Sequence, residues 1–165
     1  MKISFLSSRV VPLAAMAICI GTTGVAQAAG AQATMAVQAI VPVSCTGSIG
    51  TTMDFNSLTT SLALAVSQTD STGTIGVTCT NTGAYTVTAG NGNNFSTTRR
   101  MLNGTTNYLS YALYSDSGRS TAYTTVAGTG NGALQTLTIY GRIPSGQTAG
   151  AAGSYTDSVT FTVTY

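Results

Sequence analysis

Few side chains in this chain could support catalysis. From residue 29 to residue 165 there is no histidine, lysine, glutamate or tryptophan. Serine and cysteine nucleophiles normally need an imidazole base, Schiff-base chemistry needs lysine, and zinc sites draw on histidine or several cysteines. The sequence therefore predicts a protein that is not an enzyme and that uses no cofactor and no metal.

The acids in this part of the chain are four aspartates, namely Asp54, Asp70, Asp116 and Asp157. Two of them could in principle form the carboxylate pair of a glycosidase, but they lie near predicted turns and strand ends without a local motif. We expect them to be solvated turn residues or partners of arginine. Arg99 and Arg100 could bind a phosphate or sulfate in bidentate fashion, although a surface role or an aspartate partner explains them more simply.

The first 28 residues are typical of a secretory signal peptide. Lys2 and Arg9 precede an apolar run, and Ala26 and Ala28 form an Ala-x-Ala pattern that predicts cleavage after Ala28. The alternative is a membrane anchor, but the apolar run is shorter than the roughly 20 residues that a spanning helix needs. We therefore expect an exported protein with no membrane span after cleavage.

Two cysteines, Cys45 and Cys79, remain after that cleavage. In an oxidising compartment they predict one disulfide, which would stabilise the fold by roughly 3 to 4 kcal/mol. Four arginines balance the four aspartates, so the formal charge of this part is zero. No clustered basic face is present, and nucleic acid is not an expected partner.

Because few residues could take part in catalysis, the function must be inferred from the predicted secondary structure. Strand periodicity and Gly/Asn turns at intervals near ten residues predict an all-β sandwich. Loops are predicted at Thr51–Thr60, Ser67–Gly73 and Gly90–Asn94. The predicted strands are Ser44–Gly50, Thr74–Thr80, Tyr85–Ala89, a strand beginning at Phe95, Tyr108–Tyr114, Tyr123–Ala127, Leu134–Ile143 and Tyr155–Tyr165, with a short apolar run at Leu62–Val66. Four tyrosines fall in phase with core positions: Tyr85, Tyr111, Tyr155 and Tyr165.

The stretch Ala31–Val43 has an apolar residue at every odd position. It predicts one strand of about 40 Å, longer than average, with a continuous apolar edge. The clearest strand is Tyr155–Tyr165, and we expect no further strand after it to close the sheet. Either Ala31–Val43 serves another molecule, or it packs in its own domain as the closing strand.

The runs RRMLNGTTNYLSYALYSDSGRS and GTGNGALQTLTIYGRIPSGQTAGAAGSYTDSVTFTVTY, with SCTGS and GVTCTN before them, resemble the spore coat protein U domain family. That family includes the subunits of archaic, Csu-type chaperone-usher pili. The resemblance implies an incomplete immunoglobulin-like β-sandwich that lacks its last strand. It also implies a division into a signal peptide (1–28), a donor-strand segment (29–43) and a sandwich domain (44–165).

By this resemblance the chain is a structural pilin that polymerises by donor-strand exchange into a surface fibre for adhesion and biofilm formation. Its implied partners are identical or related pilins, a periplasmic chaperone and an outer-membrane usher, on a route through the periplasm to the cell surface. The implied donor-strand side chains are Ala33, Met35, Val37, Ala39 and Val41, and the implied bridge is Cys45–Cys79. Ala33 and Ala39 are small for side chains that fill pockets, so the register stays open. The alternative function is a secreted spore- or cell-coat binding protein that forms no fibre.

Overall fold

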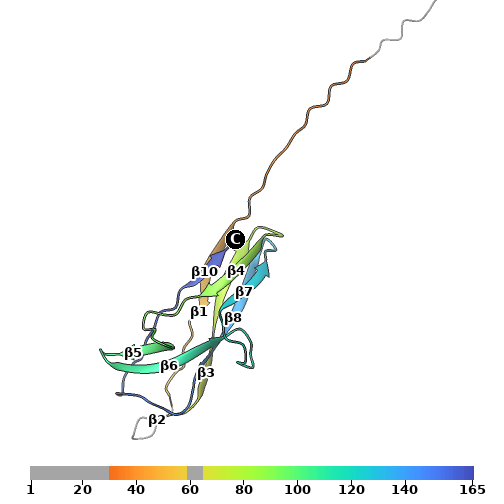
Figure 1. The fold of residues 1–165 in the computed structure, drawn as a ribbon. Coiled ribbons are helices and arrows are strands. Elements are labelled where there is room, and N and C mark those ends of the chain that lie inside the picture. Colours follow the sequence, from red (N-terminus) through yellow and green to blue (C-terminus); the bar gives the residue numbers. More distant parts are fainter. Residues whose placement is uncertain (1–29, 59–64) are drawn as a thin grey trace, which may run out of the picture. The chain divides into compact units, whose positions relative to one another are not determined.

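Every regular element among residues 30–58 and 65–165 is a β-strand (Figure 1). The computed structural model describes residues 30–58 and 65–165, which fall in two compact units, residues 1–39 and 40–165. The predicted signal peptide and most of the Leu62–Val66 run lie outside the described residues. Within the described part, no helix could cross a bilayer. The all-β fold class predicted from the sequence is confirmed.

Two antiparallel sheets form the second unit. The larger sheet contains, in spatial order, β1 (Cys45–Thr51), β3 (Thr69–Cys79), β8 (Leu134–Ile143), β6 (Asn107–Tyr114) and β5 (Arg99–Asn103). The smaller sheet contains β10 (Phe161–Thr164), β4 (Ala84–Ala89) and β7 (Thr125–Thr129). A short ladder joins β2 (Ala65–Val66) to β9 (Gln147–Thr148).

The hydrophobic core is supplied by alternate residues of the central strands. Val77 of β3, Val87 of β4, Leu109 of β6 and Ile143 of β8 are completely buried. Tyr85 and Tyr111 are buried beside them, as their phase predicts, and Tyr155 packs against this core. Tyr165, predicted to be a core residue, is 61% exposed because it lies past the end of β10.

Several strands match the sequence prediction closely. β8 has the predicted bounds, Leu134–Ile143, and β1, β4 and β6 begin within one residue of the predicted strands. The predicted Asn-Gly turn joins β5 to β6, where Gly104 has φ 68°, a left-handed conformation that glycine adopts without strain. Local turn chemistry and strand periodicity therefore agree over most of residues 84–143.

Other bounds differ from the prediction. Thr69–Gly73, predicted to be a loop, is the first half of β3, which pairs with β8 along its whole length. In that ladder Asp70 lies opposite Arg142 and accepts two hydrogen bonds from it, which compensates for weak strand propensity. The strand expected from Phe95 begins at Arg99, and the one expected at Tyr123–Ala127 is β7, two residues later.

The prediction of a strand at Ala31–Val43 is wrong for the single chain. Residues 30–43 contain no strand and are exposed throughout. A strand requires a partner for its amide and carbonyl groups, and none of the described residues forms a ladder with this segment. The alternating sequence is thus present without the pairing that would make it a strand.

Candidate strand-binding groove

One edge of the larger sheet is fastened by the predicted disulfide. Cys45 and Cys79 are directly opposite each other in the β1–β3 ladder, with Cα atoms 4.1 Å apart, and their sulfur atoms are bonded. β1 is an edge strand, and no other described strand pairs with its outer side. The disulfide therefore holds an exposed edge strand against the centre of its sheet.

The neighbouring edge of the smaller sheet is also open. β10 pairs with β4 on one side only. Upstream of β10, the carbonyl oxygens of Thr156, Ser158 and Thr160 accept hydrogen bonds from the backbone amides of Leu102, Asn93 and Gly90 respectively. Their distances are 2.9, 3.2 and 2.8 Å.

Adjacent residues of an extended chain direct their backbone groups to opposite sides. The amide and carbonyl groups of Tyr155, Asp157 and Val159 therefore face the outer side of this edge. Among the described residues, no backbone hydrogen bond satisfies these three. The edge from residue 155 to residue 164 thus offers a row of unpaired backbone groups, as an incomplete sheet does.

Between these two edges lies a continuous groove, bounded by residues 45–58 on one side and 149–165 on the other. β1 and β10 lie next to each other at one end of it (Figure 1). The groove consists of three adjoining cavities of about 420, 500 and 370 Å³. The first two share Ile49, Ile75 and Phe161, and the last two share Met53, Phe55, Met101, Asp54, Ser154 and Tyr155.

The groove exposes apolar side chains that point toward the core. Ile49 of β1 is 64% exposed, whereas Ile75, its partner across the ladder, is 5% exposed. Phe161 and Val163 of β10 are half-buried, although Val87, opposite Val163, is fully buried. Contiguous exposed apolar surface of this kind is typical of binding sites.

The two sides of the groove come closest at Gly47. A Cβ atom placed on Gly47 would lie 3.2 Å from Cγ2 of Val163, which is tighter than ordinary van der Waals contact. The side chain of Val163 therefore covers the position that a side chain of β1 would otherwise occupy. β1 and β10 are therefore in close contact at Gly47 and Val163, which both line the cavity of about 420 Å³.

One charged side chain lies on the inner phase of the groove wall. Asp157 accepts a hydrogen bond of 2.7 Å from the Tyr111 hydroxyl at Oδ2, and its Oδ1 accepts from the backbone amides of Asn93 and Asn94. Burial, and then the bond to Asp157, raises the pKa of Tyr111 well above its usual value. The carboxylate thus ties the loop of residues 90–94 to the groove wall and to the core.

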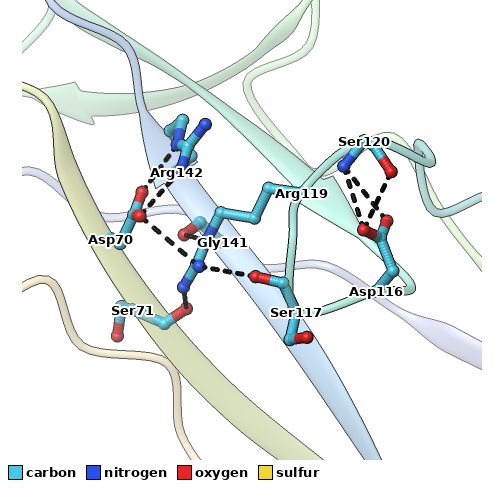
Figure 2. Close-up of polar contacts among 8 residues, drawn as sticks. All are labelled: Asp70, Ser71, Asp116, Ser117, Arg119, Ser120, Gly141 and Arg142. Atoms are coloured by element: carbon cyan, nitrogen blue, oxygen red, sulfur yellow. Dashed lines mark hydrogen bonds and ion pairs between the residues drawn. The ribbon is translucent and has the colours of Figure 1, made fainter.

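Four further charged groups, Asp70, Asp116, Arg119 and Arg142, have structural partners that do not line the groove (Figure 2). Arg142 donates two hydrogen bonds to Asp70, at 2.7 and 2.8 Å, and these hold the Asp70 pKa below its usual value. Arg119 lies 3.4 Å from the same carboxylate and donates to backbone carbonyls. Asp116 accepts from the amides of Thr121 and Ser120, which also lower its pKa. Turn and arginine-partner roles, predicted for the aspartates, are confirmed at Asp116 and Asp70.

Arg99 and Arg100 are engaged in the same loop that Asp157 holds. Arg99 donates to the carbonyl of Gly90 through Nε and Nη2, at 3.0 and 2.7 Å. Arg100 donates to the carbonyl of Asn94 at 3.0 Å, and its guanidinium lies 4.0 Å from the centre of the Tyr108 ring. Among the described residues, no group of three His, Cys, Asp or Glu side chains could hold a metal ion.

Sequence reasoning found some groove residues and missed others. The odd-numbered phase of the predicted strand Tyr155–Tyr165 includes Val159, Phe161 and Val163, and the alternation of exposure from 155 to 164 agrees with an inward face for these positions. Met53 and Phe55 were assigned to a loop, yet both line the groove. They continue the odd-numbered phase of Cys45 to Thr51, and this alternation was the signal that could have found them.

The predicted donor-strand residues all lie outside the groove wall, in the segment before β1. Ala33, Met35, Val37, Ala39 and Val41 are each exposed. Met35, Val37 and Val41 are among the most exposed apolar side chains described, at 84%, 87% and 81%.

Comparison with known proteins assigns the fold and the family. A solved structure similar to this chain is the CsuC–CsuE chaperone–tip adhesion subunit pre-assembly complex from archaic chaperone-usher Csu pili of Acinetobacter baumannii. The similarity has a TM-score of 0.54 at 18% identity and covers 76% of this chain but only 40% of the matched chain. No curated protein shows significant similarity in sequence. The family model of the Spore Coat Protein U domain matches residues 31–162, and the chain therefore belongs to that family.

Proposed function

We propose that this chain is a structural subunit of a chaperone-usher surface fibre and that it polymerises by donor-strand exchange. The observation that carries the proposal is the open groove between β1 and β10, with its apolar floor and unpaired backbone edge. Such an edge binds an extended peptide through main-chain hydrogen bonds, while alternate side chains fill the cavities.

Residues 31–43 have the chemistry that this groove requires. Their odd positions are apolar and exposed, and their even positions include Gln32, Thr34 and Gln38. Burying the side chains of Met35, Val37 and Val41 would contribute about 1.5–3 kcal/mol each. Backbone pairing along the free edge of residues 155–164 adds to this and removes the exposed edge.

The path of the chain into β1 favours exchange between copies. Ser44 continues the line of β1, because its carbonyl accepts from the Thr80 amide at 2.9 Å and its amide donates to Thr80 Oγ1 at 3.0 Å. These bonds extend the pairing of β1 by one residue toward the N-terminus. In the proposed exchange, residues 31–43 of one copy fill the groove of the next.

The same proposal includes the route and the partners. A subunit with an open groove needs that groove covered before assembly, and a periplasmic chaperone followed by an outer-membrane usher would serve this purpose. The fibre would then act at the cell surface in adhesion and biofilm formation. Support comes from the fold, which is similar to that of a structure described as a chaperone–tip adhesion subunit complex.

A charge on either face of the donor segment tests the assembly. Val37→Asp should abolish fibres on cells that express the chain with its assembly proteins, because the groove would have to bury a carboxylate. Gln38→Asp is the matched control on the opposite face and should leave fibres intact. Electron microscopy of the cells measures the outcome, and equal fibre numbers for both variants would contradict the proposal.

Moving the donor segment within the chain tests whether the groove is incomplete. Deleting residues 31–41 and appending them after Tyr165 through a flexible linker should give a stable monomer that does not polymerise. The same deletion without the appended strand should aggregate or melt at a much lower temperature. If that deleted form is an equally stable monomer, the sandwich is already complete and a coat-binding protein becomes the better assignment.

A further inference from the structure

The spacing of small side chains in the donor segment matches the spacing of the places in the groove that leave little room for a side chain. This inference rests on the proposed function and concerns the register of the donor strand. The groove restricts the size of an incoming side chain at two levels. At the first, Val163 covers Gly47; at the second, the Asp157 carboxylate accepts a hydrogen bond from Tyr111. These two residues are six positions apart, and so are the two alanines, Ala33 and Ala39.

We infer that the donor strand binds antiparallel to β10 with Ala33 opposite Val163 and Ala39 opposite Asp157. The remaining pairs follow from this register: Met35 with Phe161, Val37 with Val159, and Val41 with Tyr155. Each donor residue in the register has its side chain on the inner face, and its backbone groups meet the unpaired groups of the odd-numbered residues from 155 to 163.

Each restricted level is compatible with a methyl group. Cγ2 of Val163 already lies 3.2 Å from where a Cβ on Gly47 would be, so a large donor side chain inserted between Gly47 and Val163 would have to displace Val163. Beside Asp157 a long apolar side chain would pack against a carboxylate that is hydrogen-bonded to Tyr111, Asn93 and Asn94. The two small side chains of the donor segment thus belong at these levels.

Between the two levels lies the cavity of about 500 Å³, which Phe161 and Val159 line. Met35 and Val37 fill it in this register, as the two large side chains between the alanines. Beyond Asp157, Val41 enters the cavity of about 370 Å³ that Leu109, Ile143 and Tyr155 line. The parallel orientation would also place both alanines at the restricted levels, but it would bring Ala31 to this apolar cavity instead of Val41. Antiparallel pairing is also slightly the more stable per residue.

Engineered disulfides between neighbouring copies test the register. In this ladder Thr34 lies opposite Thr162, both on the outer face, in a pair without mutual backbone hydrogen bonds. Such pairs have closely spaced Cα atoms, which suits a disulfide. The double variant Thr34→Cys with Thr162→Cys should give covalent multimers from oxidised fibres on non-reducing gels. Thr162→Cys alone should give none.

Matched variants pair Thr162→Cys with a cysteine at Gln32, Ala36 or Gln38, which are also outer-face positions. Crosslinking through Gln38 would indicate the parallel orientation, and crosslinking through Gln32 or Ala36 a shift by two residues. Any of these, or fibres that never crosslink, overturns the register and leaves the proposed function standing. Absence of fibres from the unmodified chain overturns both.

A size test addresses the restricted level at Val163 directly. Ala33→Leu should lower the yield of fibre by about tenfold or more, because a larger side chain overpacks a fitted site. Ala36→Leu makes the same change on the outer face and should leave the yield unchanged. Equal yields for the two variants would overturn the placement of Ala33 at Gly47 and Val163.

Discussion

The gap between the two sheets is closed by a backbone segment on one side of this sandwich and is open on the other. On the side of β7, residues 121–124 join the two sheets. Tyr123 donates its backbone amide to Leu113 of β6, and Thr124 accepts from Ala89 of β4. Tyr123 is 2% exposed and packs edge-on against Phe161 at 5.7 Å. On the side of β1 and β10 no described residue makes such a connection, and the groove remains open.

The difference shows that apolar core residues alone do not close the sandwich. Phe161 contacts Tyr123 on its closed side and lines the groove on its open side. What closes one side is a backbone segment that bonds to both sheets. The open side has apolar floor residues of the same kind but lacks a segment in that position.

The largest expected effect comes from truncating one buried side chain on the closed side and comparing it with one on the open side. Tyr123→Ala should lower the free energy of unfolding by about 3–5 kcal/mol, because it leaves a cavity in a closed part of the core. Ile49→Ala should lower it by less than about 1 kcal/mol, because that side chain is mostly in solvent. Urea unfolding of the exported chain measures both.

Filling the groove should then remove the difference at Ile49. In the form with the donor segment appended after Tyr165, Ile49→Ala should cost about 2 kcal/mol or more, as a buried isoleucine does. An Ile49→Ala cost that is the same in the two forms would mean that the appended strand does not cover β1.

Removing the disulfide should loosen the open side. Replacing Cys45 and Cys79 together by serine should cost about 2–5 kcal/mol and reduce the exported amount, because β1 is held as an edge strand by that bond. Thermal unfolding and the amount of exported protein measure the effect. A melting temperature equal to that of the unchanged chain would show that the β1–β3 ladder alone suffices.

A smaller effect on the free energy of unfolding, this time an increase, is expected at Tyr123. The Tyr123 hydroxyl is buried and has no hydrogen-bond partner among the described residues. Burial also raises the pKa of this group. Tyr123→Phe should therefore raise the free energy of unfolding by about 1 kcal/mol, since it removes an unsatisfied polar atom and keeps the ring. A destabilisation of that size would instead indicate that the hydroxyl binds water or another polar group.

The smallest expected effect is the loss of stability at low pH when Asp70 becomes protonated. The Asp70 pKa is lowered in the folded state, chiefly by the hydrogen bonds from Arg142, so the charged form contributes stability above the unfolded pKa of about 4. This contribution is lost as the pH falls through the lower, folded pKa. Asp70→Asn should therefore melt a few degrees below the unchanged chain at pH 7, and this difference should shrink as the pH falls below about 4. A difference in melting temperature that does not shrink in acid would contradict this assignment.

Sequence periodicity predicted the central strands because each combines an alternating pattern with a clear turn. β8 was predicted in this way, whereas the Cys45–Cys79 bridge was predicted from the two cysteines that remain in an oxidising compartment. The first half of β3 was not, because Thr69–Gly73 becomes a strand through pairing with β8 and through Asp70 and Arg142, which are distant in sequence.

The groove could be predicted only in part. Alternation identified Val159, Phe161 and Val163, but the contact between Gly47 and Val163 and the bond from Tyr111 to Asp157 depend on how two sheets face each other. Periodicity also indicated a strand at Ala31–Val43, yet it cannot say from which molecule the partner of that strand comes.

The arrangement of the arginines has a consequence for proteolysis. Beyond residue 28 the chain has no lysine, so trypsin-like enzymes can cut only after Arg99, Arg100, Arg119 and Arg142. Each guanidinium is bound within the folded unit, to a backbone carbonyl or to Asp70. Proteases of this specificity should therefore cut residues 29–165 slowly while they are folded, and amine-reactive labels find no lysine side chain among these residues.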